Sequence, residues 1–297
     1  QVSVATRDTG GELVLAKSGL EAIGELPELD GVGNEVALLT GQKGVDNRDN
    51  PALPGKLSVP ENMKLDGRAL SKLVQKQRGV PALEVIQQLG GSDATEKSIG
   101  RGLEWLTGAQ ESDGRWDATK HGSGRKKVDT GATGLALLCY YGWGVKHNAK
   151  GHYAEPTRKA IEWLIKQQKA DGDLRGGGDM YCHGIASIAL CEAYGITKDP
   201  KLKQPAENAI RFILAAQDEK LGGWRYQPGR GSDTSVTGWQ FMAMHSARMA
   251  NLQVPDDRFT MVGRWLDSVA SGSQKGLYGY TGGGNVRPAM VATGMFC

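Results

Sequence analysis

Aromatic residues, histidine and cysteine are missing from the first hundred residues of this 297-residue chain. Phe, Trp and Tyr make up only 6% of the whole sequence, and all of them lie after residue 100. Residues 1–60 hold nine acidic and five basic side chains and are interrupted by glycine and proline. A segment of this kind buries too little apolar surface to fold alone. We therefore predict that residues 1–67 form an acidic, extended arm and that residues 68–297 form the folded domain.

Further absences exclude several classes of protein. No apolar run reaches the roughly 20 residues that cross a bilayer, so we expect no membrane span. The net charge is only +3 and no dense block of Lys and Arg occurs, so we expect no nucleic-acid partner. The first residue is not Met and no signal-peptide pattern follows it, so we expect any targeting segment to lie outside this sequence. The four cysteines follow no paired spacing, which favours free thiols: Cys139, Cys182, Cys191 and Cys297.

The part of the chain that holds the aromatic residues repeats with a period of about fifty residues. Its aromatic anchors are spaced by 58, 49 and 53 residues: Trp105, Trp163, Phe212 and Trp265. The first copy continues with Gln110, Asp113-Gly114 and Trp116, and the second and third copies keep the glutamine, as Gln168 and Gln217. The third copy also keeps its tryptophan, Trp224, whereas the second has Leu174 at that position.

Each copy has two halves of different character. In the first half apolar residues recur at helical spacing on one face, as at Ile99, Leu103 and Leu106. The second half is apolar on all sides and rich in small residues, which is typical of a helix surrounded by protein. A ring of helical hairpins satisfies both patterns, with the apolar helices inside and the amphipathic helices outside. We therefore predict an all-α fold, an α/α toroid, with one further helix leading it near residues 80–89.

The Gln-x-x-Asp-Gly-x-Trp run of residues 110–116 resembles the QW motif of squalene–hopene and oxidosqualene cyclases. The hairpin pattern of residues 68–297 is also similar to protein prenyltransferase β subunits and to squalene oxidase repeats, as in uncharacterised bacterial repeat proteins. The resemblance implies that the glutamines and tryptophans tie neighbouring hairpins together: Gln110, Trp116, Gln168, Gln217 and Trp224. It also implies five to seven hairpins where the sequence shows four. We expect either that the natural chain continues or that the ring closes through the arm or a partner.

The catalytic motif of such cyclases is incomplete in this chain. The resemblance implies an Asp-x-Asp-Asp motif whose middle aspartate is the acid, but only the last aspartate remains, as Asp129 and as Asp233, and Val128 or Ser232 stands at the acid position. Adjacent Lys and Arg would favour the ionised form of these carboxyl groups. Each aspartate precedes threonine and an apolar run, so we expect both to cap helices. They stay candidates for catalysis, together with His183.

The zinc site of prenyltransferases, which needs Asp, Cys and His, is also incomplete. Asp179, Cys182 and His183 are the nearest cluster, and His245 lies in the next repeat, but Asp-x-x-Cys is not the family's Asp-x-Cys. We therefore expect no metal and no cofactor. Cys182, His183, His245 and Trp239 are expected to face the lumen of the ring.

Two functions remain open, and the sequence leaves enzymatic activity uncertain. The first is a non-catalytic scaffold whose arm and glycine-rich loops bind other protein chains. The resemblance of this sequence to the bacterial repeat proteins favours an extracytoplasmic or envelope-associated location over a cytoplasmic one. The second is a terpenoid cyclase or prenyltransferase-type enzyme with an isoprenoid or lipid ligand in the lumen. The incomplete motifs favour the scaffold, whereas a buried carboxyl group beside an apolar cavity would favour an enzyme.

The absence of a complete ligand set predicts that the purified protein binds no metal ion in stoichiometric amount. Elemental analysis of the protein, purified without chelator, should give less than about a tenth of a metal ion per chain, an order-of-magnitude limit for adventitious binding. One zinc ion per chain would contradict this expectation.

Overall fold

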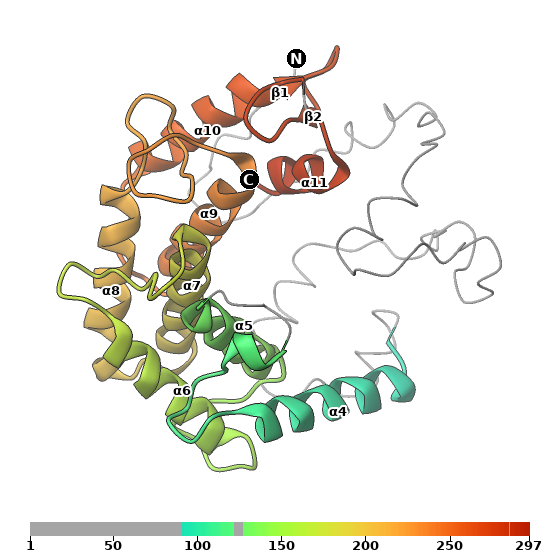
Figure 1. Ribbon diagram of the computed structural model, residues 1–297, viewed down its shortest axis with the longest axis vertical. Helices are drawn as coiled ribbons and strands as arrows, with labels where there is room; N and C mark the ends of the chain where they lie inside the picture. Colours follow the sequence, from blue (N-terminus) through green and yellow to red (C-terminus); the bar gives the residue numbers. More distant parts are fainter. Residues whose placement is uncertain (1–90, 122–126, 285) are drawn as a thin grey trace, which may run out of the picture. The chain divides into compact units, whose positions relative to one another are not determined.

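The computed structural model describes residues 91–121, 127–284 and 286–297 of the chain (Figure 1). All of them belong to one compact unit, residues 77–297. The predicted arm, its boundary after residue 67 and the predicted helix near residues 80–89 lie outside the described residues.

The described residues form helical hairpins whose helices alternate between two rows (Figure 1). The first row holds, in sequence order, α4 (Asp93–Ala109), α6 (Ala154–Gln167), α8 (Pro200–Ala215) and α10 (Asp256–Val269). The second row holds α5 (Asp129–Gly142), α7 (Met180–Thr197), α9 (Thr234–Met249) and α11 (Pro288–Phe296). Figure 1 shows α5, α7, α9 and α11 inside α6, α8 and α10. The prediction of an all-α fold of the α/α-toroid class is confirmed.

Only short elements interrupt this pattern. A 3₁₀ turn spans Ala118–His121, and β1 (Ala270–Ser271) pairs with β2 (Leu277–Tyr278) in an antiparallel ladder. Among the helices that the structure describes, none combines the length and the hydropathy of a membrane span.

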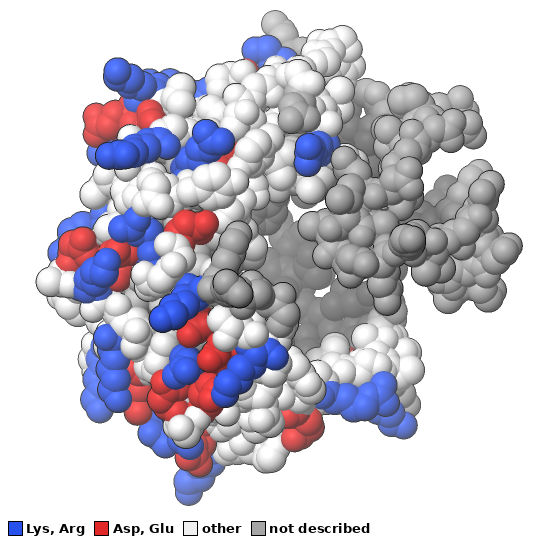
Figure 2. Space-filling view, in the orientation of Figure 1, with Lys and Arg blue, Asp and Glu red and all other residues white. Residues whose placement is uncertain are grey.

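The two rows differ as the repeat halves predict. Helix α7 is almost wholly buried and packs against both α5 and α9, and α9 packs in turn against α11. The outer helices bury one face and expose charged side chains of both signs on the other (Figure 2). Ion pairs one helical turn apart lie on these faces, as between Arg158 and Glu162 and between Lys159 and Glu155. Such exposed pairs contribute little to stability, so burial of the inner row is the main source of stability.

Glycines let the inner helices approach one another closely. A Cβ atom added at Gly184 of α7 would lie 2.5 Å from Nε2 of Gln240 in α9. One added at Gly238 of α9 would lie 2.5 Å from Cγ2 of Thr293 in α11. Neither distance leaves room for a larger side chain, so the glycine period of the sequence sets the spacing of the inner row.

A glutamine amide links each of three hairpins to the next. The side-chain Nε2 donates to the carbonyl of the glycine in the following turn and to a carbonyl in the next outer helix. The acceptors are Gly114 (2.9 Å) and Pro156 (2.9 Å) for Gln110, Gly172 (3.4 Å) and Pro205 (2.9 Å) for Gln168, and Gly222 (2.8 Å) and Arg258 (3.1 Å) for Gln217. One amide thus satisfies two carbonyl groups that belong to different hairpins.

Tryptophan fixes the same turn to its own outer helix. The indole Nε1 of Trp116 donates to the carbonyl of Leu106 in α4 at 2.8 Å, and that of Trp224 donates to Ile213 in α8 at 2.8 Å. Both rings are buried. The turn is therefore held from both sides, by the indole to the preceding helix and by the glutamine to the following helix.

The glycine of this turn lies against the backbone of the next outer helix, and its replacement should be costly. Gly222 has a φ of 91°, and an added Cβ atom would lie 2.1 Å from the carbonyl oxygen of Met261. Left-handed strain and overpacking together predict that Gly222→Ala lowers the free energy of unfolding by about 2–4 kcal/mol. Urea denaturation followed by circular dichroism would measure this loss.

Gly263 of α10 is the matched control, because a Cβ atom added there meets nothing within 4 Å. Gly263→Ala should leave stability unchanged or raise it by about 0.5–1 kcal/mol. Equal effects of the two substitutions would contradict the role given to the turn.

Candidate functional site

The inner helices α5, α7 and α9 each begin near an aspartate. Asp179 is the N-cap of α7 and Asp233 the N-cap of α9, whereas Asp129 is the first residue of α5. The loop before α9 contacts the start of α7, since the Met180 amide donates to the carbonyl of Tyr226 at 3.2 Å. The N-terminal ends of α7 and α9, which carry partial positive charge, therefore lie side by side.

Asp233 is the most unusual of these aspartates, because its side chain is 0% exposed. Its Oδ1 accepts a hydrogen bond from the Val236 amide at 2.7 Å. Its Oδ2 is buried and makes no hydrogen bond of full geometry with the described residues. The only cation near it is Arg225 of the preceding loop, among the described residues, and the distance from Nε to Oδ2 is 3.9 Å.

Burial raises the pKa of Asp233 above its ordinary value, because removal from water disfavours the charged form. The Val236 amide, the Tyr280 hydroxyl and Arg225 lower the pKa, but their combined effect is smaller than that of burial. Asp233 consequently retains its proton at a higher pH than an exposed aspartate does. A carboxyl group in this condition can act as a general acid.

Four hydroxyl groups lie around Asp233, on Tyr181, Tyr226, Ser235 and Tyr280, and we call them the hydroxyl cluster. The Tyr226 and Tyr280 oxygens are 2.6 Å apart, and the Tyr181 hydroxyl donates to Ser235 Oγ at 2.7 Å. The Tyr181 and Tyr226 rings are 6.0 Å apart between centroids. Each of these hydroxyls can both donate and accept a hydrogen bond, so the cluster can bind ligand hydroxyls or pass on protons.

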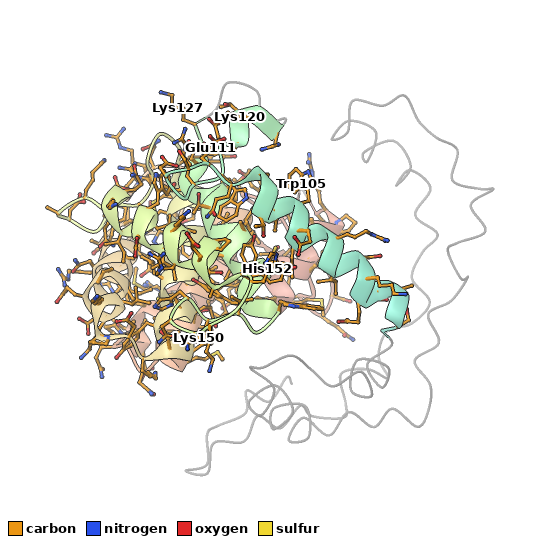
Figure 3. The ribbon with its side chains drawn as sticks, turned by 90° about the horizontal axis from the view of Figure 1, so that it is seen from below. Trp105, Glu111, Lys120, Lys127, Lys150 and His152 are labelled. Atoms are coloured by element: carbon orange, nitrogen blue, oxygen red, sulfur yellow. The ribbon has the colours of Figure 1, made fainter. Side chains whose placement is uncertain are left out.

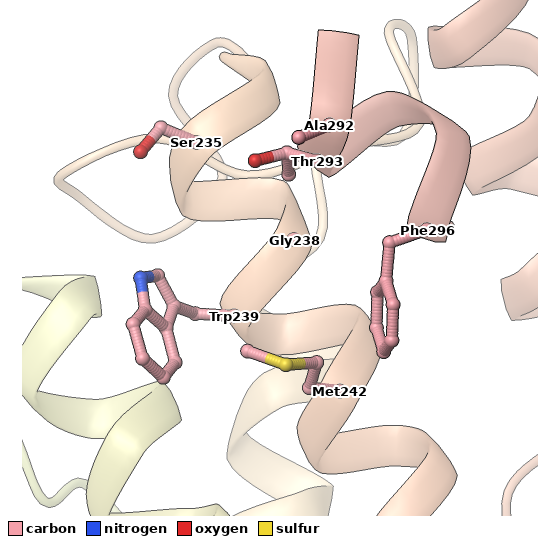
Figure 4. A pocket seen from close by; sticks show the side chains of 7 residues that line it. All are labelled: Ser235, Gly238, Trp239, Met242, Ala292, Thr293 and Phe296. Carbon is pink, nitrogen blue, oxygen red and sulfur yellow. The ribbon is translucent and has the colours of Figure 1, made fainter. Parts of the chain in front are cut away.

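A pocket of about 310 Å³ adjoins the hydroxyl cluster, and Ser235 belongs to both. Its other lining residues come from α9 and α11: Gly238, Trp239, Met242, Ala292, Thr293 and Phe296. Figure 4 shows Met242 between the side chains of Trp239 and Phe296. The pocket therefore combines apolar and aromatic surface with a hydroxyl-bearing end, a composition typical of small-molecule sites.

Asp129 has different surroundings from Asp233. Its Oδ1 accepts from the Ala118 amide at 3.3 Å, and its Oδ2 lies 3.4 Å from Arg115 Nε. Val128 occupies the N-cap position of α5, so Asp129 does not cap this helix. Figure 3 shows Lys120 paired with Glu111 (2.6 Å between Nζ and Oε1) at this end of the hairpin. Asp129 is thus part of a partly exposed network of charges.

His183 makes two hydrogen bonds within the core and faces neither the pocket nor a metal site. Its Nδ1 accepts from the Leu174 amide at 2.9 Å, and its Nε2 lies 3.1 Å from the carbonyl of Ala209. Because Nδ1 accepts, Nε2 carries the proton and donates it. Burial lowers the pKa of His183 to about 4, so the ring is neutral. In the first and third repeats a threonine, Thr133 or Thr237, accepts from the Trp amide at this place.

The other predicted lumen residues lie apart. Cys182 is buried against α5, where a Cβ atom added at Gly131 would lie 3.1 Å from its Sγ. The His245 ring packs against Phe241 and Phe259 of α10, with centroids 4.5 and 5.0 Å away. Of the four residues predicted to face the lumen, Trp239 alone lines the pocket. No group of three or more His, Cys, Asp or Glu able to hold a metal ion occurs within residues 91–121, 127–284 and 286–297.

Neither Arg225 nor the hydroxyl cluster is among the residues predicted from the sequence. A signal is present, because Trp224-x-Tyr226 of the third repeat corresponds to Tyr278-x-Tyr280 of the fourth. Tyr226 and Tyr280 are 54 residues apart, and so are Tyr181 and Ser235. Residues separated by one repeat length meet between neighbouring hairpins, and both contacts follow this rule.

Comparison with solved structures shows a likeness in fold. No family model matches the sequence, and no curated protein matches it. Among solved structures, an inactive variant of the α-1,6-mannanase GH76A of Salegentibacter sp. HEL1_6, in complex with α-1,6-mannotriose, is similar with a TM-score of 0.45 and 11% identity. The likeness covers 62% of this chain and 54% of the mannanase chain, about half of its length.

These findings correct the predicted function. The similar protein is a carbohydrate-active enzyme, which contradicts both the non-catalytic scaffold and the terpenoid cyclase or prenyltransferase alternative. The incomplete motif predicts that the catalytic acid is lost and that Asp233 is ionised, but Asp233 is fully buried and burial raises its pKa. The predicted α/α-toroid fold is not affected by this correction, but the narrower likeness to terpenoid cyclases is not supported.

The raised pKa of Asp233 predicts a specific pH dependence of stability. The folded state holds this proton more tightly than the unfolded state, whose aspartate has the ordinary value of 3.8. As pH rises from 3.8 through the raised pKa, the wild-type protein should therefore lose stability relative to the Asp233→Asn variant. The loss in the free energy of unfolding should be about 1.4 kcal/mol for each pH unit between the folded and unfolded pKa values. Asparagine is as good an N-cap as aspartate, so the cap is preserved. Urea denaturation of both proteins from acid to neutral pH would measure the difference.

Asp199, the N-cap of outer helix α8, provides a control of opposite sign. The hydrogen bond from His147 lowers the pKa of Asp199. Wild type should therefore gain stability relative to Asp199→Asn as pH rises through the acid range. If the stability difference between wild type and variant changed with pH in the same direction for Asp233→Asn and Asp199→Asn, folding would not favour the protonated form of Asp233.

Proposed function

We propose that this protein is a carbohydrate-active enzyme that cleaves a glycosidic bond with a proton supplied by Asp233. One observation carries the proposal: a fully buried carboxyl group with a raised pKa caps helix α9, two residues before Ser235, which lines the pocket. Asp173 and Asp199, which make structural hydrogen bonds, have lowered pKa values instead. The pKa of Asp173, for example, is lowered by its hydrogen bonds to Arg175 and Lys169, despite burial.

The chemistry of the pocket supports a saccharide as the ligand. A sugar ring has apolar C–H faces and a rim of hydroxyls that donate and accept. Trp239 and Phe296 offer apolar faces of matching kind. Ser235 and the tyrosines offer hydroxyl groups at one end. The pocket contains no described lysine or arginine among its lining residues, which favours a neutral sugar.

Glycoside hydrolysis also needs a second carboxyl group, and Asp179 is our candidate. It caps α7, the inner helix next to α9, and its Oδ1 accepts from the Tyr181 amide at 2.9 Å. Helices α7 and α9 pack against each other, and the loop before α9 contacts the start of α7. We therefore propose that Asp179 activates the attacking water molecule.

Release of reducing ends from a panel of α- and β-linked oligosaccharides and polysaccharides would test the proposal. The panel includes α-1,6-mannotriose, the ligand of the similar structure. With a substrate that wild type cleaves, Asp233→Asn should reduce kcat by about 10²–10⁴-fold, the usual contribution of a general acid. Asp179→Asn should cause a loss of similar size.

Asp199→Asn is the matched control, since it makes the same chemical change at the N-cap of an outer helix. It should retain at least half of the wild-type kcat. Full activity of Asp233→Asn, or failure of the wild-type protein to cleave any glycoside of the panel, would contradict the proposed function.

A further inference from the structure

We propose that the pocket between α9 and α11 binds the acetamido group of an N-acetylated sugar. This assignment of a substrate class rests on the proposed function for the reaction, but the binding itself can be measured without turnover. Three properties of the lining residues support it: the face of α9 that they occupy, the polar atoms that they leave free, and the apolar surface that fills the rest of the pocket.

One face of α9 forms the first wall of the pocket. The four lining residues of this helix recur at i, i+3, i+4 and i+7 from Ser235, so they lie in a single stripe. Gly238 brings the second wall close, because a Cβ atom added there would lie 2.5 Å from Cγ2 of Thr293 in α11. Figure 4 shows the indole nitrogen of Trp239 at the end of its ring toward Ser235. Polar atoms of both walls therefore meet in one cavity.

Two hydrogen-bond donors of this stripe have no acceptor among the described residues. The indole N–H of Trp239 makes no hydrogen bond with them. The Ser235 oxygen accepts from the Tyr181 hydroxyl at 2.7 Å, so the hydrogen of Ser235 stays available to donate. Both donors can converge on one ligand oxygen. Because none of the described lining residues is charged, a neutral carbonyl oxygen suits them better than a carboxylate.

Thr293 in the opposite wall has the complementary character. Its hydroxyl donates to the carbonyl of Ala289 at 2.9 Å within α11, so Oγ1 can only accept from a ligand. A ligand group that accepts on one side and donates on the other is a secondary amide. Its carbonyl oxygen would accept from Ser235 and Trp239, and its N–H would donate to Thr293. An ester of the same size lacks the N–H.

Apolar surface fills the remainder of the pocket. Met242 lies between Trp239 and Phe296, and Ala292 adds a methyl group (Figure 4). A sugar hydroxyl placed there would leave water without gaining a partner, whereas an acetyl methyl group is stabilised by leaving water. The volume of about 310 Å³ is near the lower end of the roughly 300–1,000 Å³ of small-molecule sites, which suits one substituted sugar unit. Phe296 is 64% exposed, so the ring hydroxyls can stay in water at the mouth.

Binding of free sugars to the full chain would test the assignment directly. Titration calorimetry should give Kd values for N-acetylglucosamine and N-acetylgalactosamine about tenfold or more below those for glucose and galactose, since the amide adds hydrogen bonds and a buried methyl group. Saturation-transfer NMR should show its largest signal at the acetyl methyl protons. Equal affinity for sugars with and without the acetamido group, or no binding of either kind, would overturn the assignment.

Three conservative variants test the individual contacts. Ser235→Ala and Trp239→Phe each remove one donor, and Thr293→Val removes the acceptor but keeps the methyl group that lies beside Gly238. Each should raise the Kd of N-acetylglucosamine by about fivefold or more, the usual contribution of one hydrogen bond. Trp105→Phe is the matched control, because Trp105 is 58% exposed on α4 and does not line the pocket. Its Kd should match that of wild type. Unchanged affinity in all three pocket variants would refute these contacts.

Turnover separates this assignment from the proposed function. Glycosides with an acetamido group should be cleaved with a kcat/KM about tenfold or more above that of their hydroxyl counterparts. If wild type cleaves both kinds equally and Asp233→Asn is inactive, the acetamido assignment is wrong and the proposed function stands. If N-acetylglucosamine binds in a manner that depends on Trp239 but no glycoside of either kind is cleaved, the proposed function fails and the acetamido site stands.

Discussion

Contact between the turn of one hairpin and the backbone of the next outer helix is the constraint on which the structure depends. The turn glycine lies against a carbonyl of that helix, and a glutamine amide bridges the same two segments. The third repeat shows how this contact reaches the site. The Trp224 carbonyl accepts from the Asp233 amide at 2.8 Å, and the Trp224 indole is tied to α8. The residues that join the hairpins therefore also fix the carboxyl group.

The site lies where two hairpins meet, and each contributes a different part. The third supplies Asp233, Tyr226 and Ser235, whereas the fourth supplies Tyr280 and the pocket wall of α11. Helix α7 of the second hairpin completes it with Tyr181. Burial inside the array raises the pKa of Asp233, and the hydroxyl groups of the two hairpins lie between the start of α9 and the neighbouring loops. Both conditions depend on close packing of the inner helices.

The sequence predicts the fold well and the site poorly, for physical reasons. Helical periodicity and a fifty-residue repeat are local patterns, so the hairpins, the inner row and the tying glutamines can be read from them. The pKa of Asp233 depends on burial, which no local pattern reports. The adjacent Arg230 predicts an ionised carboxyl group, but the cation found near it is Arg225, and desolvation outweighs its effect. The sequence makes His183 a candidate for metal binding or catalysis, but it takes the place of a threonine where Leu174 replaces tryptophan.

The turn contacts have an evolutionary consequence. Because main-chain carbonyl groups and one amide join neighbouring hairpins, the turn contacts constrain a glycine and a glutamine in each of the first three units. Most exposed positions of the outer helices can change without altering these contacts. Descendants of one ancestor can then retain the same shape long after their sequences have ceased to look related, and new chemistry can arise in a single pair of loops.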